Sequence, residues 1–167
     1  MQETFYATVA QLCFALLGLW WIVVQFKYQQ WMTDPSHRRM AYDISLYFIL
    51  PGIMSLVSLL AADAKFLWRA GFTLAGILGL VESFLMVTSA GGTTSRSIWL
   101  RLGRAVVLAL YLLIILFAAI ADLPQRLGLP LQPLEIEGLL NALIIFLGVN
   151  FAWMFFAEPM PGQASPQ

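Results

Sequence analysis

Glu82 is an acidic residue in the middle of an apolar run, residues 70–90, that is otherwise long enough to cross a bilayer. A charged side chain at the centre of a membrane helix costs about 2.5–3.5 kcal/mol on insertion scales, so it usually faces a partner, a cavity or another subunit. A buried carboxyl group of this kind can coordinate a cation or exchange a proton. The chemistry that Glu82 suggests is ion or proton handling inside the membrane.

The same run carries small residues at a four-residue step: Gly71, Ala75, Gly79 and Ser83. On a helix, Glu82 lies within about 60° of the first three. Membrane helices approach one another closely along such small-residue faces. We therefore expect Glu82 to point into a protein contact and not into lipid.

Other polar features are predicted at a similar depth, counting about 1.5 Å per residue along spans of alternating direction. They are Tyr47, Pro51 and Gly52 in the second span, Tyr111 in the fourth and Asn150 in the fifth. Pro51 cannot donate to the carbonyl of Tyr47, which therefore needs another partner. The spacing predicts a solute- or proton-handling layer centred on Glu82, with Asn150 and the Tyr47 carbonyl as its neighbours.

Each member of this layer also has a structural interpretation. Pro51 with Gly52 is often a simple helix kink, and Asn150 is often a hydrogen bond between helices. Tyr111 could simply pack against neighbouring side chains, and Glu82 could pair with Asn150 across two helices.

The composition is that of a membrane protein. Of 167 residues, 60% are hydrophobic and 11% charged, whereas a soluble domain carries about 25% charged residues. A membrane helix needs about 20 apolar residues, and the sequence predicts five spans, at about 6–26, 42–62, 70–90, 105–121 and 139–157. The fourth is the shortest and could begin earlier, through Trp99 and Leu102. A four-span bundle with one re-entrant segment is the alternative.

We therefore expect an all-α integral membrane protein, a bundle of about five transmembrane helices with short connections, in a single polytopic domain over residues 1–157. The first and third connections carry most of the basic residues, namely Lys27, Arg38, Arg39, Arg96, Arg101 and Arg104. Basic loops stay in the cytoplasm, which places the N-terminus outside and the C-terminus inside. The expected location is the bacterial inner (plasma) membrane.

The connections are too short for a second domain. The longest, 122–138, contains Pro124, Pro130 and Pro133, which favour an extended outer loop that also holds Glu135 and Glu137. The tail, 158–167, is polar and is expected to be disordered. The Gly-containing segment 90–95 is expected to be a flexible turn. It is not a phosphate-binding loop, because it lacks the Gly-Lys-Ser/Thr ending and the preceding strand of such a loop.

Charged residues gather before the second span. Asp43 is expected to cap the helix start there. Lys27, Arg38 and Arg39 could contact an anionic lipid headgroup, or serve only to hold this connection in the cytoplasm. His37 is the only histidine and has no second ligand at metal-binding spacing, so we expect neither a metal nor a cofactor.

Several function classes are disfavoured. Equal numbers of acidic and basic residues, nine of each, predict no nucleic-acid partner. No pair of aspartates lies within the spans, and a Ser–His dyad would need His37 in a connection, so we expect no catalytic residues. Cys13, the single cysteine, is expected to be an apolar filler.

Two functional hypotheses remain. The first is a small polytopic protein that moves or binds a small solute or ion through the Glu82 layer, as a homo-oligomer. The second is a non-catalytic membrane subunit, or an assembly partner, of a larger membrane complex. A third, a membrane enzyme acting on a lipid or with an external cofactor, would need a lateral opening near Arg38 and Arg39 or near Glu82. In each case the partners are the lipid bilayer and other membrane chains.

Overall fold

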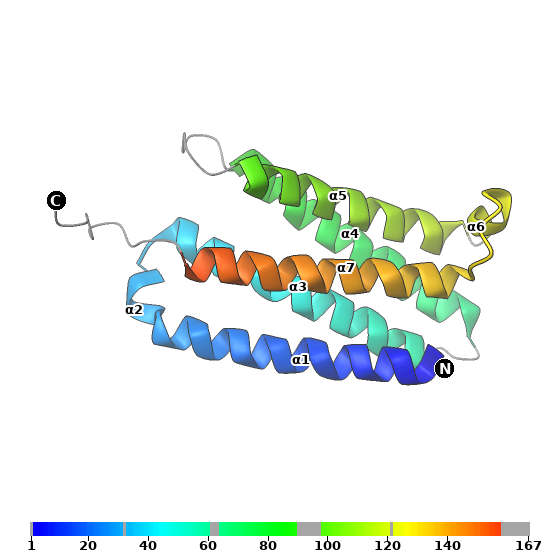
Figure 1. The fold of residues 1–167 in the computed structure, drawn as a ribbon, viewed down its shortest axis with the longest axis horizontal. Coiled ribbons are helices and arrows are strands. Elements are labelled where there is room, and N and C mark those ends of the chain that lie inside the picture. Colours follow the sequence, from blue (N-terminus) through cyan, green and yellow to red (C-terminus); the bar gives the residue numbers. More distant parts are fainter. Residues whose placement is uncertain (1, 32, 61–63, 90–97, 121, 158–167) are drawn as a thin grey trace.

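The computed structural model of the chain describes residues 2–31, 33–60, 64–89, 98–120 and 122–157. These ranges form helices and no strand. The long helices are α1 (Gln2–Phe26), α3 (Pro35–Leu60), α4 (Lys65–Ser89), α5 (Ile98–Ala119) and α7 (Pro133–Phe156). Two four-residue helices, α2 (Tyr28–Trp31) and α6 (Leu123–Arg126), lie at opposite ends of the bundle (Figure 1). We use these as names for the two ends, the α2 end and the α6 end.

Four helices are long and apolar enough to cross a membrane: α1, α3, α7 and the segment Leu102–Ala119 of α5. The predicted all-helical class is thereby confirmed, and four of the predicted spans coincide with helices that could cross a membrane. α4 is a further long helix in the position of the third predicted span. α5 begins at Ile98, which confirms the extension of the fourth predicted span through Trp99 and Leu102.

The second predicted span begins too late. α3 starts at Pro35, because the carboxylate of Asp34 caps it: one oxygen accepts from the Ser36 amide at 2.9 Å and the other from the Ser36 hydroxyl at 2.9 Å. The prediction that Asp43 is the cap is therefore wrong. Asp43 lies about two turns inside the helix, where its side chain is buried.

The predicted extended loop at 122–138 is also wrong in part. Residues 123–126 form α6, and α7 begins at Pro133. The Gln132 amide donates to the Glu135 carboxylate at 2.9 Å, and proline is well suited to the first helical position since it has no amide hydrogen to satisfy. Glu137 consequently lies in a helix and not in a loop. The segment 90–95 and the tail 158–167 lie outside the described residues.

α3 is the central helix and contacts α1, α4 and α7, while α5 packs against α4 and α7. Glycines allow the closest approaches. A Cβ on Gly71 would lie 2.6 Å from Val57 of α3, and one on Gly79 would overlap the ring of Tyr111 of α5. This confirms that the small-residue face of α4 is a close helix contact, formed within one chain.

An aromatic cluster closes the α2 end. The Trp31 and Phe155 rings are 4.5 Å apart, and Trp20 lies 5.9 Å from Trp31. The Trp20 indole donates to the Ala41 carbonyl of α3 at 3.0 Å. This cluster joins α1, α2, α3 and α7 and holds the first turns of α3 in place.

Candidate functional site

A narrow cleft lies between α3, α4 and α5, in the half of the bundle nearer the α2 end. We call it the carboxylate cleft. It is lined by Asp43, Leu46 and Tyr47 of α3, Gly79, Glu82 and Ser83 of α4, and Tyr111 of α5.

Helix periodicity brings these side chains together. Asp43 and Tyr47 are four residues apart and therefore share a face of α3, as Gly79 and Ser83 share a face of α4. Gly79 has no side chain, which leaves space for the Tyr111 ring to pack directly on the α4 backbone. The cleft thus depends on one glycine and on the register of three helices.

Asp43 and Glu82 are the acidic groups of the cleft. The Asp43 side chain is 5% exposed, and in the described part of the chain neither of its oxygens has a hydrogen-bond partner. Glu82 acts on Asp43 as a repulsive charge, whereas Arg39 and Arg104 act as attractive charges. Two carboxylates near one another in a poorly solvated site favour sharing a proton or binding a cation.

Arg104 is the buried cation of this region. It lies on α5 and is 9% exposed, and its guanidinium approaches the Met40 sulfur of α3 at 3.8 Å. Its charge offsets part of the negative charge of the carboxylate cleft. Together with the exposed Arg39, Arg104 lowers the net negative charge around the two carboxyl groups.

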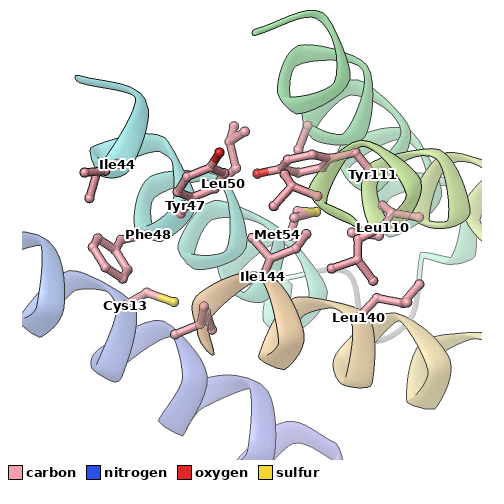
Figure 2. Packing of buried hydrophobic residues seen from close by; sticks show 14 of the residues in the cluster. Cys13, Ile44, Tyr47, Phe48, Leu50, Met54, Leu110, Tyr111, Leu140 and Ile144 are labelled. Atoms are coloured by element: carbon pink, nitrogen blue, oxygen red, sulfur yellow. The ribbon is translucent and has the colours of Figure 1, made fainter. Parts of the chain in front are cut away.

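Two tyrosines form the wall of the cleft on the side of α3 and α5. Figure 2 shows the rings of Tyr47 and Tyr111 with their hydroxyl oxygens turned toward one another between these helices. Both side chains are buried, and the Tyr111 hydroxyl has no hydrogen-bond partner among the described residues. Each hydroxyl can both donate and accept, so this pair can relay a proton or hold a water molecule.

The cleft is small. The space open to the centre of a water molecule is about 10 Å³, close to the minimum that holds one water. In this conformation the cleft can take a water, a proton or a small ion, and it has no room for a larger solute.

The structure brings together three of the predicted layer residues, Glu82, Tyr47 and Tyr111. Asn150 does not join them. It lies on the exposed face of α7, where its amide donates to the Phe146 carbonyl at 2.7 Å. The sequence predicts Asn150 and Glu82 at a similar depth in the bundle. Depth along a helix does not specify which side of that helix faces the core.

The remaining predicted residues lie elsewhere. Pro51 is buried within α3, which continues through it, and a Cβ on Gly52 would contact Cys13 and Phe14 of α1. At the α2 end, Arg38 and Arg39 are exposed on the first turns of α3. There the Lys27 ammonium group lies 5.5 Å from the centre of the Phe156 ring.

Sequence reasoning missed three buried polar residues. The sequence predicts Asp43 to be a cap and Glu137 to lie in a loop, and it suggests no role for Asn141. Glu137 and Asn141 are both 0% exposed. The signal was available in Gln132, Pro133 and Glu135, a pattern that starts a helix at 133 and places residues 137 and 141 on one face.

Within the described ranges, no group of three or more His, Cys, Asp or Glu side chains is placed to hold a metal ion. No family model, curated protein or solved structure matches the chain.

Proposed function

We propose that this chain is an integral membrane protein that takes up a proton at the carboxylate cleft and moves it, or a solute coupled to it, across the bilayer. The carrying observation is the pair Asp43 and Glu82, facing one cleft between three helices, with the oxygens of Asp43 buried and unpaired among the described residues. Structural carboxylates inside membrane proteins are normally paired, whereas proton-exchanging ones are not fully satisfied.

Size and charge favour a proton as the species that enters the cleft. The space admits about one water molecule. Arg39 is exposed, so the charged groups that lie between the helices are Asp43, Glu82 and Arg104, and their charges sum to zero when the carboxyl pair takes up one proton. Burial of a neutral site in a low-dielectric bundle costs much less than burial of a net charge.

Passage beyond the cleft needs a change of conformation. Between Tyr47 and the α6 end, Leu50 and Met54 of α3 are buried in the same hydrophobic cluster as Leu110 of α5 and Ile144 of α7 (Figure 2). These side chains form an apolar layer. Pro51 lies in this part of α3 and leaves one backbone carbonyl without its usual amide donor, which makes this the point where α3 bends most easily.

The proposed topology has all five long helices crossing the bacterial inner membrane, with the N-terminus outside and the C-terminus in the cytoplasm. Lys27, Arg38, Arg39 and Arg104 then gather toward the cytoplasmic side, as the positive-inside rule requires. The carboxylate cleft lies in the cytoplasmic half, and Arg38 and Arg39 lie where they can contact anionic lipid headgroups.

The test is proton flux into liposomes that contain the purified protein and a trapped pH-sensitive dye, under a potassium diffusion potential. We expect the wild-type protein to acidify the lumen faster than empty liposomes do. Glu82→Gln and Asp43→Asn should each reduce the rate of acidification about tenfold or more, because a side-chain amide neither gains nor loses a proton near neutral pH.

Glu3→Gln is the matched control, since Glu3 is exposed at the far end of α1 and is expected to leave the rate unchanged. Wild-type flux equal to that of empty liposomes, or unchanged flux in both cleft variants, would reject proton transfer at this site.

The homo-oligomer that we propose for this protein is favoured by the outer face of α7. Its exposed residues form a stripe with alternating four- and three-residue steps: Leu139, Leu143, Phe146, Asn150 and Trp153. Helices that pair along such a heptad seam often carry one asparagine, which sets the register. An amide donates and accepts, so two copies of Asn150 complement one another across a twofold axis along the membrane normal. The occupant we assign to this face is a second copy of the chain.

A further inference from the structure

A second buried polar group lies toward the α6 end, beyond the apolar layer. We call it the Glu137 cluster. It consists of Glu137 and Asn141 of α7, Ser55 and Ser58 of α3, and Tyr6 of α1.

The helix register places these residues at one level. α3 and α7 run antiparallel, and Gly148 packs on Tyr47, with a Cβ at Gly148 lying 2.7 Å from that of Tyr47. Glu137 precedes Gly148 by as many residues as Ser58 follows Tyr47. Glu137 of α7 and Ser58 of α3 therefore lie at the same level of the α3–α7 interface. By the same count, Asn141 lies within about one residue of the level of Ser55.

Tyr6 closes the cluster from α1. Its hydroxyl donates to the Leu134 carbonyl of α7 and lies near both Ser58 and Glu137. A Cβ on Gly138 would lie 3.3 Å from the same hydroxyl, which shows how closely α1 and α7 approach here. The Tyr6 ring in turn packs edge-on against Phe72 of α4, at 6.4 Å between centres.

The cluster contains polar atoms that the described part of the chain does not satisfy. Both oxygens of Glu137, both polar atoms of the Asn141 amide and the Ser55 hydroxyl have no hydrogen-bond partner there, and all three side chains are 0% exposed. Buried polar atoms are nearly always paired, so orphaned ones at one place indicate a group that occupies the site. A closely packed structural core would not collect them.

The donor set specifies the occupant. Carboxylate, amide and hydroxyl oxygens are hard ligands, which suit a proton or an alkali cation and not a soft metal. Glu137 is the one acidic group of the cluster, so one positive charge neutralises it. We propose that the Glu137 cluster binds one monovalent cation, H⁺ or Na⁺, between α1, α3 and α7.

Among the residues that the structure describes, no neighbouring group supplies that charge. Tyr6 is the titratable group that faces Glu137 from α1, while α3 contributes serines and α4 contributes Phe72. Arg69, on α4 toward this end, donates instead to the carbonyls of Ala118 and Ala119 of α5. The Glu137 cluster contains no residue of the carboxylate cleft, so either proposal can fail without the other.

The experiment measures the thermal unfolding midpoint of nanodisc-held protein from pH 5 to 9, with Na⁺ or choline at constant ionic strength. We expect the wild-type midpoint at pH 8–9 to fall in choline and to be restored by Na⁺ if the site takes Na⁺. If only low pH restores it, the site takes a proton. Glu137→Gln should remove the Na⁺ dependence or, if the site takes a proton, the part of the pH dependence that the Glu137 carboxyl group contributes. The part contributed by the carboxylate cleft should remain.

Ser55→Ala, a smaller change that keeps Glu137, should weaken the apparent cation affinity about tenfold, because the loss of one oxygen contact to a charged group costs about as much as the loss of one hydrogen bond to such a group. The Ser55→Ala variant tests the site even if Glu137→Gln does not fold. Glu3→Gln is the control for loss of an acidic group elsewhere. Two results would overturn the proposal. The first is a wild-type midpoint that depends on neither cation. The second is a dependence that is not reduced in Glu137→Gln, or an apparent cation affinity that is unchanged in Ser55→Ala.

Discussion

Acidic residues in this chain have different roles that follow from their surroundings. Asp34 is well satisfied at the start of α3, where it accepts hydrogen bonds from Ser36 and contacts the His37 ring. Asp43, Glu82 and Glu137 lie between helices, and the described residues offer neither Asp43 nor Glu137 a hydrogen-bond donor. The first arrangement stabilises a helix end, whereas the second leaves a carboxyl group ready to bind a cation.

The capping role of Asp34 predicts a pH dependence. Hydrogen bonds from the Ser36 amide, and then from His37 and the Ser36 hydroxyl, lower the pKa of Asp34 from 3.8 to about 2. Because the folded pKa is below the unfolded one, the stabilisation is present above about pH 4 and is lost as the pH falls toward 2. Asp34→Ala should lower the thermal midpoint at pH 6 and should flatten its dependence between pH 4 and 2.

The midpoint of nanodisc-held protein, followed by circular dichroism, measures this effect. Ser36→Ala, which retains the amide donor, should have a smaller effect. A midpoint at pH 6 that is the same in Asp34→Ala and in the wild type would show that the cap does not contribute.

At the scale of the helices, the carboxylate cleft depends on how closely α4 approaches α5. Gly76 and Gly79 face α5, where added side chains would meet Ile115 and Tyr111. In a membrane, close contacts of this kind hold helices together because lipid provides no hydrophobic force between them. The same approach positions Tyr111 opposite Tyr47, so packing and site geometry have one origin.

Gly79→Ala tests this dependence. The added methyl group would overlap the Tyr111 ring, which is 1% exposed and has little freedom to move. Overpacking of this kind costs about 1–3 kcal/mol, against a gain of up to about 1 kcal/mol in helix propensity. We expect a lower thermal midpoint and reduced proton flux.

Gly18→Ala is the matched control. Gly18 lies in α1, and an added Cβ there meets no atom within 4 Å. This variant should be as stable as the wild type or slightly more stable. Equal stability of the two glycine variants would show that the α4–α5 contact is looser than the structure indicates.

At the scale of the whole molecule, polar residues are divided between the inside and the lipid-facing surface. Asp43, Glu137 and Asn141 are buried, whereas Asn150 is exposed on α7 and Gln11 is exposed on α1. A polar side chain that faces lipid in a spanning helix is costly unless another chain covers it. The outer stripe of α7 differs from α1 in its alternating four- and three-residue steps around Asn150, and it is the face along which we expect two copies to meet.

Asn150→Leu should weaken that association by about 1 kcal/mol, or roughly fivefold in dissociation constant, as expected for one hydrogen bond between membrane helices. Förster transfer between labelled copies, diluted with lipid, measures the constant, and native mass spectrometry identifies the species. Gln11→Leu is the control on α1. A monomeric wild type, a partner chain of a different kind, or a loss of association in Gln11→Leu alone would reject the α7 dimer.

Local sequence patterns determined the helical membrane class and the approximate positions of the helices. Apolar runs of about 20 residues become helices in lipid because every backbone group must be satisfied within the segment. The side on which Glu82 faces protein was also predictable, since the small residues around it repeat with the helix period. Helix starts were less predictable: the runs of apolar residues begin later than the caps at Asp34 and Gln132.

Only the tertiary structure decided which polar groups meet. A one-dimensional depth count placed Asn150 beside Glu82, but the rotation of α7 turns Asn150 outward and Glu137 and Asn141 inward. That rotation depends on contacts distant in sequence, such as Gly148 on Tyr47 and Gly138 on Phe5, whose combined packing selects one face of the helix. Because lipid and protein interior are both apolar, the sequence of a membrane helix alone specifies its facing weakly, and packing between helices determines it.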